Sequence, residues 1–227
     1  MKSLLTFIFI SISFFSYSQD WYIEKPDYDE IEINIQKEDS NLFYKTLLDR
    51  YLKADSTLNW IEKRHLYYGY TFNENYASYF HSTYTDSLRV IFQKEKLGQE
   101  DYNQIVVFSD ELLKKNPFDL NALDYQLFSL EELGETEEFN KKLIQFGIVI
   151  DAILSSGNGT SKEEAFYVIY TSHEYALLNI LGFQFGGTQS LIEHYDYLTV
   201  AENIAGIEGL YFDVSPCLNS ILKIKKD

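Results

Sequence analysis

The chain has 227 residues, of which 35 are aspartate or glutamate and 19 are lysine or arginine, so its formal net charge is −16. Affinity for nucleic acids and for anionic lipid surfaces depends on lysine and arginine side chains, and this charge balance argues against both functions. Aromatic residues make up 17% of the chain and hydrophobic residues 45%, which is enough apolar material for a folded core and argues against extensive disorder.

The first 18 residues have the pattern of a secretory signal peptide. Lys2 precedes an apolar run over residues 4–15, and Ser16 and Ser18 are small residues at the positions that signal peptidase reads. The run is shorter than the ~20 residues that a membrane-spanning helix needs, so cleavage after Ser18 is favoured over a membrane anchor. We therefore expect an exported protein, periplasmic or secreted, without a membrane span.

The cysteine content adds two further expectations. Cys217 is the single cysteine, so the chain cannot form an internal disulfide. Gln19 stands where a bacterial lipoprotein carries its lipidated cysteine, so we expect no lipid anchor. No basic residue lies near Cys217 in sequence to lower the pKa of its thiol, and we interpret it as a small buried hydrophobic residue.

Two helices are expected before residue 80. The first covers residues 31–53, although residues 38–41 are an alternative break within it. The second begins at Asp55 or Ser56 and runs into an aromatic patch at residues 67–72. Residues 73–85 are predicted to form a loop.

The central third contains the clearest helical periodicity. Apolar residues recur at helical spacing over residues 101–116, and Pro117 ends this helix. A second helix is predicted over residues 120–133, ended by Gly134, and a third over residues 139–154. Short turns between helices of similar length predict stacked helical hairpins.

This central part resembles tetratricopeptide repeats over about residues 96–150. Leu-Gly recurs at residues 97–98 and 133–134, near the period of such repeats, and Pro117 stands at the position of their closing proline. Leu127 and Phe139 depart from the pattern, because both replace small residues that allow close helix packing. The resemblance covers about one and a half repeats, so other helices must complete the stack.

The last third is predicted to be rich in strands. After a turn at residues 155–160, residues 161–164 match a capping box that would begin a short helical turn. Strands are expected over residues 166–171, 183–192, 195–200 and 210–214, with a short helix at 174–181 and a frayed tail at 223–227. The predicted fold is α+β, with tetratricopeptide-like stacked hairpins followed by a small antiparallel sheet. The expected divisions are a signal peptide (1–18), a helical repeat-like region (19–156) and a β-rich region packed on the helices (157–227).

Several segments together are similar to one family of uncharacterised exported bacterial proteins that carry a domain of unknown function. The similarity extends over about residues 29–215. The segments that carry it are 65–70, 117–123, 151–157, 173–175, 189–191, 195–197 and 210–212. The similarity implies that the source is an outer-membrane-bearing bacterium. It implies no particular activity, because the family has none established.

The sharpest chemical hypothesis is a metal or ligand site formed by His173, Glu174, His194 and Asp196. The spacing of these four residues is not specific to a metal site. The alternative is that the two histidines lie on the surface or are hydrogen-bonded, and that the two acids are ordinary polar neighbours. No Gly-x-Ser-x-Gly elbow and no phosphate-binding loop occurs, and no pair of acids stands out among the 35. We assign no catalytic residue and no metal ligand, and we expect no cofactor.

Tyr67 and Tyr70, with Phe72, could line a groove for a peptide or a sugar, but the favoured interpretation is that they fill a helical core. The acidic helices could also form a negatively charged concave surface for basic segments of a partner. The leading functional hypothesis is a non-enzymatic protein–protein interaction or scaffold module of the cell envelope, with a protein or peptide partner. The alternative is a small-ligand-binding protein or hydrolase whose site lies where the helices meet the sheet. The sequence does not indicate an oligomeric state.

Overall fold

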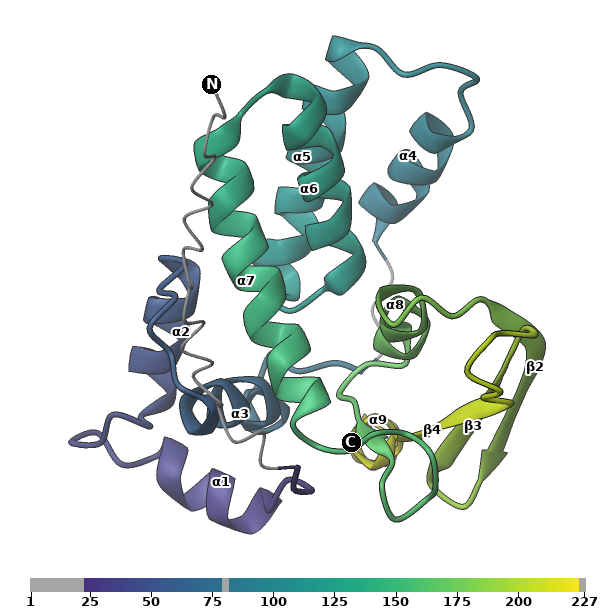
Figure 1. Cartoon of the computed structure of the whole chain (residues 1–227). Helices are drawn as coiled ribbons and strands as arrows, with labels where there is room; N and C mark the ends of the chain where they lie inside the picture. The colour runs from purple at the N-terminus through teal and green to yellow at the C-terminus, as the bar shows by residue number, and fades with distance from the viewer. Residues whose placement is uncertain (1–22, 79–81, 225–227) are drawn as a thin grey trace, which may run out of the picture.

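A computed structural model describes residues 23–78 and 82–224, which fold into helices and one small sheet (Figure 1). The predicted signal peptide lies outside these residues. The fold is α+β, as predicted. Its elements are α1 (Tyr28–Ile35), α2 (Tyr44–Leu52), α3 (Trp60–Gly69), η1 (Tyr70–Phe72), α4 (Thr83–Phe92), α5 (Gln99–Lys115), α6 (Leu120–Leu133), α7 (Thr136–Leu154), β1 (Phe166–Tyr167), α8 (Ser172–Ile180), β2 (Phe185–Ile192), β3 (Tyr195–Val200), β4 (Gly209–Asp213) and α9 (Ser215–Ile224).

The segment predicted as one helix over residues 31–53 forms two helices, α1 and α2. The break between them includes residues 38–41, where the sequence offered it as an alternative. Ser40 organises this break, because its carbonyl oxygen accepts from the Phe43 amide at 3.1 Å and its hydroxyl oxygen accepts from the Leu42 amide at 3.0 Å. A serine that bonds its own backbone neighbours offers the chain an alternative to the helix.

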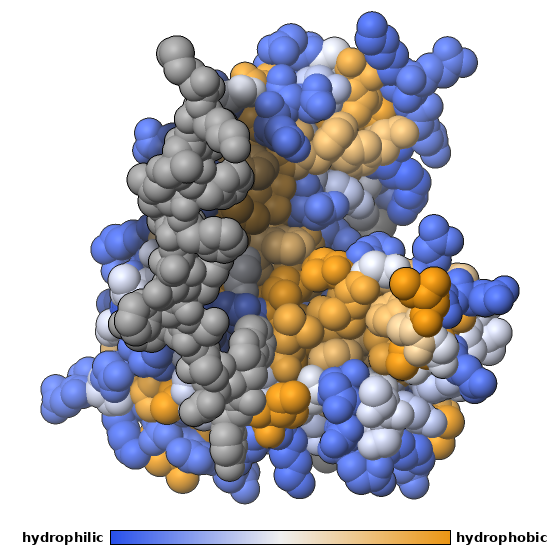
Figure 2. Space-filling model, viewed as in Figure 1, coloured by the Kyte–Doolittle hydropathy of each residue, from blue (hydrophilic) through white to orange (hydrophobic). Residues whose placement is uncertain are grey.

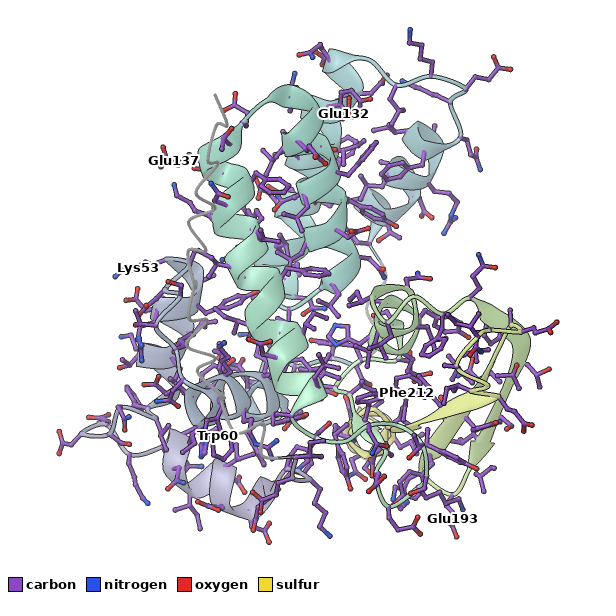
Figure 3. All side chains as sticks on the ribbon, viewed as in Figure 1. Lys53, Trp60, Glu132, Glu137, Glu193 and Phe212 are labelled. Atoms are coloured by element: carbon purple, nitrogen blue, oxygen red, sulfur yellow. The ribbon has the colours of Figure 1, made fainter. Side chains whose placement is uncertain are left out.

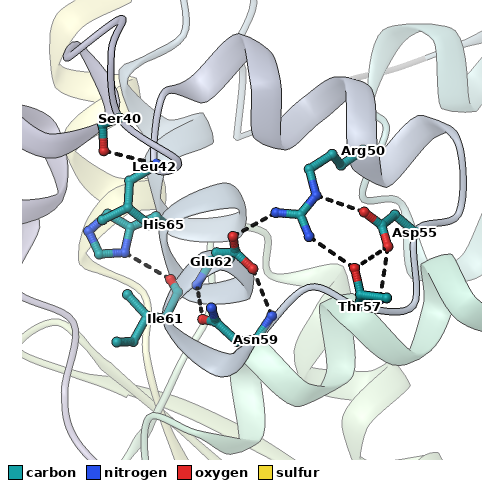
Figure 4. A network of polar contacts seen from close by, with 9 residues as sticks. All are labelled: Ser40, Leu42, Arg50, Asp55, Thr57, Asn59, Ile61, Glu62 and His65. Carbon is teal, nitrogen blue, oxygen red and sulfur yellow. Dashed lines mark hydrogen bonds and ion pairs between the residues drawn. The ribbon is translucent and has the colours of Figure 1, made fainter.

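Helix α3 begins at Trp60, so the predicted start at Asp55 or Ser56 is wrong. Asn59 and Glu62 form a capping box, in which the Glu62 amide donates to Asn59 Oδ1 at 3.0 Å and the Asn59 amide donates to Glu62 Oε2 at 2.9 Å. Asp55 instead accepts from Thr57 and from Arg50 Nε, and these hydrogen bonds lower the pKa of Asp55 (Figure 4). The side chain that looked like a helix cap therefore fixes the preceding turn.

The three central helices lie where the periodicity predicts them. Helix α6 has the predicted bounds, with Asp119 as its N-cap and Gly134 in the left-handed conformation at its end, at φ 74°. Helices α5 and α7 begin a few residues earlier than predicted. Helix α5 packs on α6, α6 packs on α7, and α4 packs on α5. The stacked hairpins are thus present, and their assignment as tetratricopeptide repeats stays a prediction.

Helix α4 was not predicted, and its first residues fall in the predicted loop at residues 73–85. Ser82 caps it, because its hydroxyl oxygen accepts from the Tyr84 amide at 3.2 Å. Leu88 and Ile91 form its buried face, and they pack with Ile105, Leu112 and Ala122. We call this cluster the small core.

The sheet is mixed, so the expectation of a purely antiparallel sheet needs correction. Its strand order is β1-β4-β3-β2, and β1 pairs with β4 in parallel while the other neighbours are antiparallel. Strand β1 has only two residues, not the predicted six, because the chain turns into α8 soon after Tyr167.

The capping box predicted at residues 161–164 starts no helix. Asn158 Nδ2 and Thr160 Oγ1 donate to the Glu164 carboxylate at 2.7 and 3.1 Å, so this side chain closes a turn.

Helix α9 was also missed, and residues 223–224 of the predicted frayed tail belong to it. Cys217 on this helix is fully buried, and burial raises the pKa of its thiol to about 12, which confirms its interpretation as a core residue. In the part of the chain that is described, no helix has the length and apolarity to cross a membrane.

A larger cluster, the main core, joins segments from the whole length of the described chain. It contains buried residues of α1, α2, α3, α7, α8 and α9 together with β1, β3 and β4. Phe212 of β4 points into it, whereas Glu193 lies at the outer tip of the β2–β3 turn (Figure 3). The main core therefore crosses the predicted division at residues 156 and 157.

Candidate functional site

Two of the predicted site residues, Glu174 and Asp196, meet between α8 and the sheet. Glu174 lies in the first turn of α8 and is fully buried, and Asp196 on β3 is 6% exposed. Gln189 on β2 bridges them, because its Nε2 donates to Asp196 Oδ2 at 2.8 Å and to Glu174 Oε2 at 3.4 Å. Gln189 stands opposite Leu198, so it shares the α8-facing side of the sheet with Asp196.

Glu174 carries a proton at neutral pH. Burial, and then the charge and the carboxyl group of Asp196, raise the pKa of Glu174 from 4.5 to about 9. Oε1 of Glu174 is buried without a hydrogen-bond partner among the described residues. Such a pair has the composition of a general acid and base, but both residues are buried. In the conformation described, it connects α8 to the sheet through Gln189.

His173 precedes Glu174 in sequence, but its imidazole faces the main core. Tyr67 Oη accepts from the Ile169 amide at 3.2 Å and shares a hydrogen bond of 2.7 Å with His173 Nδ1. Burial lowers the pKa of His173 to about 3, with a smaller opposing effect from the Phe118 carbonyl. His173 is therefore neutral. Tyr67 and His173 are in contact, but their contact is a hydrogen bond inside the main core and not part of an open site.

His194 belongs to the turn between β2 and β3 and not to the strand. Its Nε2 lies 3.4 Å from Asp213 Oδ2, and its ring packs against the ring of Tyr195 at 4.1 Å between centroids. Because three of the four residues of the predicted quartet are buried and His194 pairs elsewhere, the quartet does not surround one open site. Within the described ranges, no group of three histidine, cysteine or acidic residues is arranged to hold a metal ion.

Tyr70 is 4% exposed, and its hydroxyl donates to the Lys115 carbonyl at 3.2 Å. Phe118 packs against the rings of Tyr67 and Tyr70, at centroid distances of 6.0 and 5.2 Å. Both tyrosines are thus core residues, which was the favoured interpretation. Thr71 and Phe72 are the members of the patch that line a cavity.

The sequence did not reveal an open surface along β2. This strand is the edge of the sheet opposite β1, and all eight of its residues are exposed. It contains no charged residue and no proline, the two residue types that usually protect an edge strand from pairing. Its one protective feature is an irregularity between Phe185 and Gln189, which leaves residues 189–192 in regular register.

Apolar side chains of β2 and α8 surround this edge. The Tyr175 ring of α8 packs against the Phe185 ring at 5.3 Å, and the Tyr175 hydroxyl donates to Gln189 Oε1 at 2.5 Å. Leu191 is 54% exposed, and Ile180 and Leu181 at the end of α8 are also exposed. Figure 2 shows apolar residues gathered over α7 and continuing across α8 toward the sheet, with polar residues around them. We call β2 with Tyr175, Ile180 and Leu181 the β2 edge surface.

The comparisons with known proteins give a family and no function. No curated protein and no solved structure matches the chain. A family match covers residues 29–223, which is most of the chain and agrees with the extent expected from the sequence. The chain therefore belongs to the family described as a domain of unknown function (DUF4919).

Proposed function

We propose that this protein is a non-enzymatic protein–protein interaction module that binds an extended peptide segment of a partner along β2. The observation that carries the proposal is the edge strand itself, which has eight exposed residues and neither charge nor proline. Unpaired amide and carbonyl groups at such an edge are a template for one further strand. Main-chain hydrogen bonds supply affinity in this mode, and side-chain positions on the two faces of the sheet supply specificity.

The surroundings of β2 define the partner segment. Alternate side chains of an added strand would lie on the side of Tyr175, Phe185 and Leu191, where apolar residues find apolar contacts. The chain carries a net charge of −16, and Glu193 directly follows the strand. We therefore expect a segment with apolar residues at every second position and with lysine or arginine rather than acidic residues.

We also propose that the protein works outside the cytoplasm, in the periplasm or the medium. The support is the signal-peptide pattern of residues 1–18. The mass of the protein recovered from the native host tests this, because cleavage after Ser18 leaves Gln19 as the first residue. An uncut chain retained in the cytoplasm would contradict it.

A displayed library of random peptides tests the binding mode. We expect the selected peptides to be extended and basic, and to slow hydrogen exchange of the β2 amides when bound. Leu191→Lys places a positive charge on the β2 edge surface and should weaken binding at least about tenfold, equivalent to ~1.4 kcal/mol. Val107→Lys is the matched control, because Val107 on α5 is 56% exposed and Leu191 is 54% exposed.

Three results would overturn the proposal. They are failure to select any peptide, equal loss of binding in both lysine variants, and protection of amides outside β2 with none in β2.

A further inference from the structure

A cavity of about 490 Å³ lies where the first helix of the described chain, the turn after η1 and the last helix α9 meet. It is separate from the β2 edge surface, and none of its lining residues belongs to the predicted quartet. Ligand pockets for small molecules typically have about 300–1,000 Å³ and combine aromatic walls with a few polar groups. The volume of this cavity falls in that range.

Hydrogen bonds between distant segments fix the walls of the cavity. Ser78 Oγ donates to the Cys217 carbonyl at 3.1 Å, and the Ser78 amide lies 3.5 Å from Ser220 Oγ, so the turn after η1 is attached to α9. Tyr76 Oη donates to the Ile169 carbonyl at 2.6 Å, which fixes one aromatic wall. The cavity is thus built on buried contacts and is formed before any ligand arrives.

The lining combines aromatic rings with neutral hydrogen-bonding groups. Tyr28, Phe72 and Tyr76 supply the rings, and the Tyr28 and Phe72 rings stand 6.4 Å apart at 60°. Asn73 and Asn219 supply carboxamides, and serine and threonine residues add hydroxyl groups. In addition, the buried hydroxyl of Tyr28 has no hydrogen-bond partner within the described chain.

The charges of the lining exclude one class of ligand. Glu74 is the one ionisable acid among the lining residues, and none of them is lysine, arginine or histidine. A phosphate or carboxylate ligand would find no cation to pair with and would meet the Glu74 carboxylate. The ligand is therefore uncharged or cationic.

We propose that this cavity binds an uncharged polyhydroxylated molecule with the dimensions of a mono- or disaccharide. Aromatic rings pack against the C–H faces of a sugar, and carboxamides, hydroxyls and a carboxylate bond its hydroxyl groups. The abundance of hydrogen-bonding side chains favours this ligand over a quaternary ammonium ion, which would need the rings and Glu74 alone.

Titration calorimetry and ligand-observed NMR on the mature chain test the proposal with two probes. One is a panel of uncharged sugars (glucose, galactose, N-acetylglucosamine, maltose and cellobiose), and the other is choline. We expect at least one sugar to bind with an affinity that does not change with salt concentration. Choline should not bind.

Asn219→Ala and Glu74→Gln are suitable variants because both side chains are exposed at the rim, so that folding is preserved. Asn219→Ala should weaken sugar binding about tenfold. Glu74→Gln should weaken it only a few fold, because an amide still bonds hydroxyl groups. Leu191→Lys on the β2 edge surface is the control and should leave sugar binding unchanged, so this test is independent of the peptide-binding proposal.

The proposal is wrong if no sugar of the panel binds, or if binding is the same in Asn219→Ala, Glu74→Gln and the unaltered chain. If choline bound in a salt-sensitive way and this binding disappeared in Glu74→Gln, the cavity would be a cation site and not a sugar site.

Discussion

The main core and the small core are built in different ways. The small core joins residues between Leu88 and Ala122, which are neighbours in sequence as well as in space. The main core joins residues from Ile31 to Cys217, and tyrosine hydroxyls connect its distant segments. Tyr51 Oη donates to the Pro117 carbonyl at 2.7 Å, and Tyr68 Oη donates to the Ala152 carbonyl at 3.1 Å.

This difference explains the role of the buried tyrosines in the main core. A helical hairpin positions its own residues, so apolar contact is sufficient to hold it together. Segments that come from opposite ends of a chain need directional contacts to fix how they meet, and tyrosine provides a large apolar ring together with a hydroxyl donor. The buried tyrosines of the main core, among them Tyr51, Tyr67 and Tyr68, thus supply both volume and polar links.

The largest expected effect separates the two cores directly. Phe118 is fully buried between Tyr51, Tyr67 and Tyr70, and Phe118→Ala should lower the free energy of unfolding by ~3–5 kcal/mol. Because this site joins several segments, native-state hydrogen exchange should become faster in α3, α7 and α8 together. Urea denaturation measures the loss of stability.

Ile105→Ala in the small core is the matched comparison, because Ile105 is also fully buried. We expect ~2–4 kcal/mol of local destabilisation, with faster exchange in α4, α5 and α6 and little change in α8. Equal acceleration over the whole chain in both variants would show that the two cores unfold as one unit.

A third effect, smaller per pH unit, concerns the buried carboxyl pair next to the main core. Glu174 keeps its proton up to about pH 9 in the folded chain and loses it near 4.5 when unfolded. The unfolded state therefore binds fewer protons in this window, and stability falls as pH rises through it, by up to ~1.4 kcal/mol per pH unit. Glu174→Gln should remove this slope.

His173 acts in the opposite direction at lower pH, because its pKa falls from 6.5 to about 3 and the unfolded state takes up the proton first. The slope due to Glu174 is therefore free of the His173 contribution between pH 6.5 and about pH 9. Urea titrations of the variant and the unaltered chain across that window measure it. If stability changed with pH in the same way in Glu174→Gln and in the unaltered chain, Glu174 would not be the group that holds the proton.

The smallest expected effect tests the polar links. Tyr51→Phe removes the hydroxyl that bonds the Pro117 carbonyl and should cost ~1 kcal/mol, since the ring stays in place. Tyr84→Phe at the border of the small core should change stability by less than ~0.5 kcal/mol. If the two variants lose the same stability, the hydroxyl links do not distinguish the cores.

Local signals made much of the fold predictable. Asp119 and Gly134 marked both ends of α6, because a cap and a left-handed glycine act within one turn of the helix. Helix α9 was missed although Pro216 stands in its first turn, a position that favours helix starts. The parallel pairing of β1 with β4 depends on contacts between residues about 46 positions apart, as in Phe166 and Phe212, and no local pattern encodes it.

The candidate sites were less predictable than the fold. Glu174 and Asp196 were named together from the sequence, and they do meet. The pairing of His194 with Asp213 depends on the register of β3 and β4. The β2 edge surface follows from the strand order, and the cavity from the position of α9, so neither leaves a signature in a stretch of residues.

The contacts of Ser78 with α9 have a consequence for how the molecule matures. They join residues 139 and 142 positions apart, so the pocket beside them cannot close until α9 has packed against the turn after η1. Long-range closures of this kind form slowly, whereas the α5–α7 hairpins can assemble as soon as they emerge. A chain truncated before Ser215 would lack the wall that Ser215, Pro216, Asn219 and Ser220 supply, so ligand binding would report whether α9 is in place.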